Sequence, residues 1–330
     1  MSRFLDAMSY FKRKLRALFY RMLAAGSVPV KRSIWYKRLF VDSMHERYPD
    51  NVWYREHDER NYDLVNLGSS SARWAFDYDH TNIKGMNWAN QPQTLIDDFR
   101  LLKNFHSILK RGGTVIITIM PFSGLNKSTG VMDTLKYLPT LYWDVVQDMP
   151  YLKEARRLQE YPVLFGKPAI KAGLRYLLHR ERVDADWRET IENNPMSLEQ
   201  LEEDAGRWMQ GWTRQFNILD VEAPLTDDNR RGRNIRIKVM RELIDFCTER
   251  GYRPVYVIPP VTNQLAKWFT PRFRELYIYD FLKEVDRDIR LLDYLNEDEL
   301  SDQSLYFNSF FLNRRGREIF TRKVKGALSE

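Results

Sequence analysis

The chain has 330 residues, 43% of them hydrophobic and 29% charged, and a formal net charge of +7. This composition predicts a globular protein with a hydrophobic core and excludes a wholly disordered chain, while the single cysteine excludes an intramolecular disulfide. The length suits one large α/β domain with an insertion, or two modest domains.

The positive charge is concentrated at the N-terminus. Residues 1–38 contain ten basic residues and one acidic residue, a net +9, which leaves the rest of the chain at about −2, the difference between +7 and +9. Because the excess lies in one arm and no nucleic-acid-binding motif accompanies it, binding to nucleic acid is not expected.

Residues 1–40 are predicted to form an arm containing an amphipathic helix. Apolar residues recur at spacings of three and four, and the other side is almost entirely Lys and Arg: Leu5, Met8, Phe11, Leu15, Leu18, Phe19 and Met22 form the apolar side. Residues 1–25 are suited either to an anionic membrane surface or to packing on their own domain. Basic residues break every apolar run, so neither a transmembrane span nor a signal peptide is expected. The expected location is the cytoplasm, free or peripheral at the inner face of the membrane.

Residues 41–330 are predicted to form a single α/β domain. Apolar runs typical of buried strands lie at 62–67, 114–120, 254–258 and, more weakly, 289–294, and predicted helices at 95–109 and 235–250 alternate with them. Strands that alternate with helices imply right-handed βαβ crossovers. We therefore expect a three-layer α/β/α sandwich with a central parallel sheet, and a ligand site beyond the carboxyl ends of its strands.

Residues 124–230 depart from this alternation and are predicted to form a helical insertion. Their aromatic side chains could stack on sugar rings, although packing between helices is the commoner role for each: Tyr142, Trp143, Tyr151, Trp187, Trp208 and Trp212.

No metal and no cofactor are expected. The five histidines show no paired spacing (His45, His57, His80, His106 and His179), and Cys247 lies on the apolar side of a predicted helix as a buried, inert thiol. The turn after the first strand has one glycine where a dinucleotide fingerprint has three.

Two segments resemble blocks of the SGNH (GDSL-like) hydrolases. Residues 66–70, Asn-Leu-Gly-Ser-Ser, resemble the nucleophile block in the form found in polysaccharide- and teichoic-acid-associated members, and place Ser70 at the nucleophile position. Taken alone, such a serine turn is more often a helix cap. Residues 86–92 resemble the second block, with Asn87 and Ala89 near the oxyanion-binding positions.

A third segment, residues 257–263, is similar to the strand-then-proline segment of D-alanine-transfer proteins of teichoic acid synthesis. The resemblance covers residues 60–123 and 230–325. It implies an SGNH or flavodoxin-like sandwich, with oxyanion- or substrate-binding roles for Ser71, Asn87, Ala89, Ser123 and Asn263.

The last segment departs from the family pattern. Residues 308–316 resemble the block that supplies acid and base, but Asn308 stands at the position of the acid and Phe311 at that of the base. Phenylalanine cannot accept a proton from a serine hydroxyl, so the usual triad cannot form. Neither His80 nor His106 is placed near Ser70 by the sequence.

Two functions follow from this pattern. The favoured one is a catalytically degenerate SGNH-like protein that binds a glycan or a partner enzyme in a cell-surface polysaccharide pathway. The alternative is a serine esterase or O-acyltransferase that acts on acylated glycans through Ser70 and a non-standard base.

Overall fold

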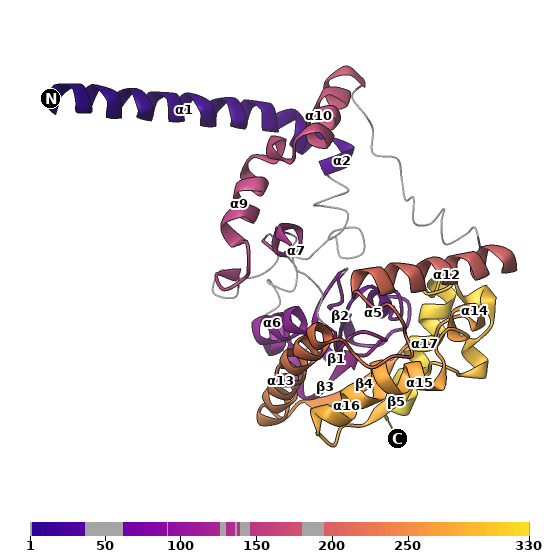
Figure 1. Ribbon diagram of the computed structural model, residues 1–330. Helices are drawn as coiled ribbons and strands as arrows, with labels where there is room; N and C mark the ends of the chain where they lie inside the picture. Colours follow the sequence, from indigo (N-terminus) through magenta and orange to yellow (C-terminus); the bar gives the residue numbers. More distant parts are fainter. Residues whose placement is uncertain are drawn as a thin grey trace. The chain divides into compact units, whose positions relative to one another are not determined.

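The computed structural model describes residues 2–36, 62–90, 92–125, 130–135, 137–138, 146–179 and 195–329, and the chain divides into two compact units (Figure 1). We call Met1–Val52 with Thr129–Ala185 the helical unit, and Trp53–Ser128 with Asp186–Glu330 the α/β unit.

The α/β unit is built on an all-parallel sheet of five strands in the order β2-β1-β3-β4-β5. The strands are β1 (Tyr62–Leu67), β2 (Gly85–Asn87), β3 (Leu109–Thr118), β4 (Arg253–Ile258) and β5 (Leu291–Asp293). This order is that of doubly wound, flavodoxin-like sheets. The predicted α/β class with a parallel sheet is confirmed.

Two details of the sheet differ from the sequence-based expectation. The edge strand β2 was not predicted, because its three residues lie in a polar segment that resembles a turn. The predicted helix at 95–109 and strand at 114–120 left Gly112 and Gly113 between them, whereas both glycines lie inside β3, which begins at Leu109. Gly112 has a positive φ of 71°, which glycine adopts readily, and it lies where the register between β1 and β3 shifts.

Helices cover both faces of the sheet. On one face Leu64, Ile116 and Val257 share a buried cluster with Phe320 and Val324 of α17 (Arg314–Ala327). On the other, α13 (Asp227–Glu249) packs against β4 and against α6 (Leu95–Phe105). Further α-helices described in this unit are α5 (Ser70–Arg73), α12 (Leu198–Gln215), α14 (Asn263–Ala266), α15 (Pro271–Arg274) and α16 (Asp280–Val285). Short 3-10 and π-helical turns connect some of the elements, among them Glu275–Tyr279 between α15 and α16.

Cys247 is fully buried on α13, as predicted. Burial raises the pKa of its thiol to about 12, although the Arg250 guanidinium lowers it, so the reactive thiolate is scarce at neutral pH.

The helical unit consists of α1 (Ser2–Arg32), α2 (Ile34–Tyr36), α7 (Val131–Leu135), α9 (Leu152–Glu160), the turn Pro162–Phe165 and α10 (Lys167–His179). The C-terminal part of α1 packs against α10 and that turn, with Val30 buried close to Gly173. The expected arm (1–40) thus shares a unit with the first part of the expected insertion (124–230), while α12 belongs to the α/β unit.

Among the described helices, none has the length and apolarity that crossing a bilayer requires.

Candidate functional site

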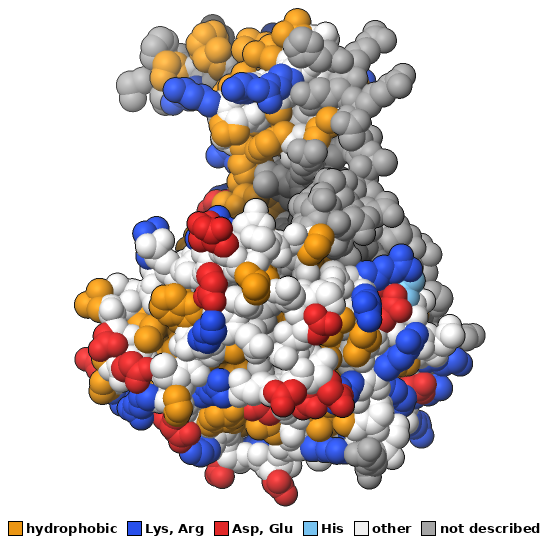
Figure 2. All heavy atoms as spheres, turned by 90° about the vertical axis from the view of Figure 1, so that its right-hand side faces the viewer, with side chains coloured by type: hydrophobic (Ala, Val, Ile, Leu, Met, Phe, Trp, Pro, Cys, Tyr) orange, Lys and Arg blue, Asp and Glu red, His pale blue; other side chains and the backbone are white. Residues whose placement is uncertain are grey.

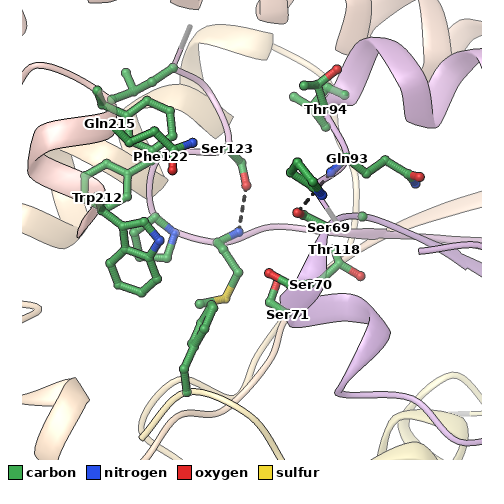
Figure 3. Close-up of a pocket in the computed structure, with 18 of the residues that line it drawn as sticks. Ser69, Ser70, Ser71, Gln93, Thr94, Thr118, Phe122, Ser123, Trp212 and Gln215 are labelled. Carbon is green, nitrogen blue, oxygen red and sulfur yellow. Dashed lines mark hydrogen bonds between the residues drawn. The ribbon is translucent and has the colours of Figure 1, made fainter. Parts of the chain in front are cut away.

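A cavity of about 530 Å³ lies beyond the carboxyl ends of β1 and β3 (Figure 3). Its wall combines the turns that follow both strands, the start of α6, one side of α12, one residue of α13 and the loop before α17. This is the edge of a parallel sheet at which ligand sites form. The cavity brings together residues from positions 68 to 311.

Gly68 makes the sharp turn that leads from β1 into α5. Its φ is +134°, and a Cβ here would lie 2.7 Å from the Ala72 Cβ and 3.0 Å from the Thr118 Cβ. Its N–H donates to Asp98 Oδ1 at 2.9 Å. Only glycine fits such a position, and the turn presents the following three serines to the cavity.

The three serines do not share one environment. Ser69 precedes α5, and its Oγ accepts a hydrogen bond from the Gln93 N–H at 3.2 Å. Ser70 and Ser71 also line the cavity (Figure 3), and no hydrogen bond holds either hydroxyl to another residue in the described part of the chain. The Ser70 hydroxyl, at the predicted nucleophile position, is therefore accessible to a ligand.

Phe311, which the sequence resemblance predicts to stand at the position of the base, lines the same cavity as Ser70. Its ring packs among Trp74, Trp208 and Phe310, at centroid distances of 5.9, 5.3 and 4.7 Å. Phe311 is therefore part of an apolar aromatic wall of the cavity and offers no proton acceptor.

No histidine is among the described residues that line the cavity. His80 pairs with Asp77 at 2.8 Å on the surface, and His106 contacts Tyr252 Oη at 3.1 Å. His45 and His57 lie outside the described residues, as does the side chain of His179. Within the described ranges, Ser70 has no imidazole to activate it.

Asn308, which the sequence resemblance predicts to stand at the position of the acid, stabilises its own loop. Its Oδ1 accepts from the N–H groups of Phe310 and Phe311 at 2.9 and 2.7 Å. The next residue, Ser309, donates from N and Oγ to Asp204 Oδ2 of α12, at 3.0 and 2.6 Å. These bonds fix the Phe311 loop against α12, so the aromatic wall is held in place.

The other predicted site residues separate into two groups. Ser123 lines the cavity, where its Oγ accepts from the Met120 N–H at 2.9 Å (Figure 3). Asn87, Ala89 and Asn263 do not line it. The Asn87 amide donates to backbone carbonyls around α5 and its Oδ1 accepts from the Ala89 N–H, while Asn263 is exposed on α14.

Two of the aromatic residues expected to contact sugars line the cavity, Trp208 and Trp212 on α12. Their rings lie 5.5 Å apart, and Trp212 meets Phe310 edge-on at 5.0 Å. They therefore pack against neighbouring aromatic residues and also form part of the cavity wall. Tyr151 lies in the helical unit, and Tyr142, Trp143 and Trp187 lie outside the described residues.

The polar residues of the cavity that sequence reasoning missed include Gln93, Asp98 and Arg236. The buried Asp98 carboxylate accepts from Gly68 N and from Gln93 Nε2, the latter at 2.6 Å. A signal did exist, because Asp98 and Arg236 each occupy a position on the apolar side of their helix. A charge at such a position predicts a buried polar contact or a site.

Comparisons with known proteins supply no identity: no protein-family model matches the chain, and no curated protein matches it. Within the described ranges, no group of three or more His, Cys, Asp or Glu residues is arranged to hold a metal ion.

Proposed function

We propose that the α/β unit is a degenerate SGNH-like domain that binds a glycan of a cell-surface polysaccharide pathway in the cavity beside Ser70. The observation that carries the proposal is the meeting of Ser70 and Phe311 in one cavity. In the resemblance these are the nucleophile and base positions, and they lie far apart in the sequence.

The chemistry of the cavity favours binding over catalysis. A serine hydroxyl titrates far above neutrality, and a nucleophile without its base loses several orders of magnitude in rate. The volume of about 530 Å³ lies within the range of small-molecule sites. Tryptophan and phenylalanine faces suit the apolar faces of sugar rings, while serine hydroxyls supply hydrogen bonds.

Glycan binding is tested by screening the purified protein on an array of oligosaccharides with and without O-acetyl groups, beside Trp212→Ala. We expect the wild type to bind at least one glycan of the array, and Trp212→Ala to bind the same glycan at least about tenfold more weakly. Trp268→Ala is the matched control, because Trp268 is half exposed and does not line the cavity. Equal binding by the wild type and Trp212→Ala would place the glycan elsewhere.

The alternative function, a serine esterase or O-acyltransferase, is favoured by the unengaged Ser70 hydroxyl at a strand end. Fluorophosphonate labelling and p-nitrophenyl acetate turnover, measured beside Ser70→Ala, separate the two. The degenerate site predicts no Ser70-dependent signal. Labelling and turnover that Ser70→Ala abolishes would establish the esterase reading instead.

A gain-of-function variant makes the same test from the opposite direction. Phe311→His with Asn308→Asp restores the residue types of the family block, and an aspartate can accept the same two N–H bonds that Asn308 accepts. We expect weak Ser70-dependent turnover of p-nitrophenyl acetate to appear. The triple variant with Ser70→Ala is the control.

A further inference from the structure

Among the described residues that line the cavity, Arg236 is the one with a positive charge. It is 3% exposed, and its Nη1 donates to Gly232 O within α13 at a long 3.4 Å. In the described part of the chain, no ion pair joins its guanidinium to a carboxylate. Asp98, the acidic residue of the lining, is already stabilised by donors from Gly68 and Gln93.

A buried guanidinium with so few partners is costly. Burial lowers the pKa of Arg236 and the Asp97 carboxylate raises it, but arginine stays protonated at neutral pH. A buried charge that lacks a partner destabilises the fold. A bound anion would offset that cost.

Arg233, one turn earlier on the same helix and equally buried, provides the contrast. Its Nη1 pairs with Glu284 at 3.0 Å, and its Nη2 donates to Leu276 O. In the described part of the chain, Arg233 therefore has a carboxylate partner, although its Nε has no acceptor, whereas Arg236 has no carboxylate partner. The other N–H donors of the Arg236 guanidinium make no hydrogen bond to the described residues and are available to a ligand.

We propose that Arg236 binds an anionic group, a carboxylate or a phosphate, on the ligand of this cavity. The inference rests on the proposed binding function and narrows the ligand from glycans in general to acidic glycans. Arginine presents five N–H donors in a planar fork, which matches two oxygens of either group.

The test compares three sugars by calorimetry: methyl glucuronide, glucose 6-phosphate and neutral methyl glucoside. The wild type is expected to bind an acidic sugar at least about tenfold more tightly than the neutral one. Arg236→Met should lose that preference and melt at the same temperature or a few degrees higher, since it removes an unpaired buried charge. Arg233→Met should keep the preference and melt lower, because it loses a formed ion pair.

The outcomes separate this inference from the proposed function. Binding of neutral sugar with no acidic preference, or a preference that survives Arg236→Met, overturns the anion site alone. If no sugar binds, inorganic phosphate is the remaining probe. If phosphate raises the melting temperature of the wild type but not that of Arg236→Met, the anion site is supported without the glycan. If phosphate raises the melting temperature of neither protein, the anion site is overturned.

A second inference concerns the helical unit, where α1 carries an exposed apolar side. Phe11 and Met22 are 64% and 66% exposed, and Leu15, Leu18 and Phe19 are also exposed. These residues recur at spacings of three and four, so they lie on one side of the helix. The C-terminal part of the same helix is packed, with Ser27 and Val30 buried.

The adjoining helix α10 repeats this pattern. Ala169 and Ala172 are buried, whereas Leu174, Leu177 and Leu178 are exposed, Leu178 at 75%. Together α1 and α10 contain eleven basic residues and one acidic residue, Asp6. In Figure 2, orange hydrophobic and blue basic side chains lie together at the top of the view.

We infer that the exposed sides of α1 and α10 dock on an anionic lipid bilayer. Leucine and phenylalanine would enter the boundary between headgroups and acyl chains, while Lys and Arg reach the anionic headgroups. The excess of positive charge decides between a membrane and an uncharged apolar partner, since each basic residue near an anionic surface adds to the affinity.

Vesicle co-sedimentation tests this surface with the full chain. We expect binding to vesicles of 70% phosphatidylcholine and 30% phosphatidylglycerol, weak binding to pure phosphatidylcholine, and a decrease with salt. Leu15→Glu with Leu18→Glu, and separately Leu174→Glu with Leu177→Glu, should each reduce binding at least about tenfold. Leu219→Glu, which alters a 98% exposed leucine of the α/β unit, is the control and should bind as the wild type.

No binding to anionic vesicles by the wild type would overturn the inference. So would unchanged binding by both leucine pairs, because attraction to any polyanion would then account for the signal. Equal loss in the Leu219→Glu control would also overturn it, since added negative charge alone would then explain the effect.

Discussion

The two units of the chain differ in where they place charge and apolar surface. The helical unit has a net charge of +9 and the α/β unit about −2. In the α/β unit, large apolar side chains fill both faces of the sheet and the cavity wall, and Asp98, Asp204 and Arg233 have bonded partners. In the helical unit, α1 and α10 leave leucine and phenylalanine in water.

This difference separates surfaces that stabilise the folded protein from surfaces that are available to binding partners. A buried side chain contributes to folding stability, so its replacement costs free energy of unfolding. An exposed apolar side chain contributes little to folding and marks a place for a partner. Substitutions in the α/β unit should therefore change stability, whereas those on the exposed sides of α1 and α10 should change binding alone.

The largest stability effect is expected at the turn that positions the serines. Gly68→Ala forces an alanine into a φ of +134° and brings its Cβ against Ala72 and Thr118. We expect a loss of about 3–5 kcal/mol in the free energy of unfolding, measured by urea titration. Gly112→Ala is the matched control. It shares the positive φ but meets no atom within 4 Å, so it should cost only about 1 kcal/mol.

The bond between α12 and the Phe311 loop should have the next largest effect. Asp204→Ala leaves the buried N–H and hydroxyl of Ser309 without their acceptor. We expect the free energy of unfolding, measured by urea titration, to fall by about 2–4 kcal/mol. Asp228→Ala is the control, because Asp228 makes only an exposed ion pair with Arg231. A loss as small as that of the control would mean that α12 does not hold the aromatic wall.

Cys247 makes the α/β core sensitive to alkaline pH. Its thiol pKa is about 12 in the folded protein against an ordinary 9, so the folded state favours the neutral thiol. This contribution is fully present below pH 9 and is lost as the pH rises toward 12, by about 2 kcal/mol at pH 10.5. Urea titrations below pH 9 and at pH 10.5 measure this loss. Between the two, the free energy of unfolding of the wild type should fall by about 2 kcal/mol more than that of Cys247→Ala. Parallel losses would show that the thiol is not desolvated.

The sequence predicted the parallel α/β class because three apolar runs and a weaker fourth one alternate with amphipathic helices. It did not reveal β2, whose pairing with β1 comes from tertiary contact and not from its own residues. At the site, Gly68-Ser69-Ser70 and Phe311 were found by order along the chain. Gln93, Asp98 and Arg236 were missed because their meeting depends on how α6 and α13 pack, which periodicity does not specify.

The smallest stability effect is expected on the exposed side of α1, and it sharpens the comparison most. Leu15→Glu with Leu18→Glu should leave the free energy of unfolding within about 0.5 kcal/mol of the wild type, since both leucines are at least half exposed. Val30→Glu, in the same helix, is the counterpart. It buries a charge beside Gly173 and should lower the free energy of unfolding by about 2 kcal/mol or more. A similar cost for both variants would show that the exposed leucines are covered in the native protein. Loss of vesicle binding without loss of stability would identify them as a surface kept for the membrane.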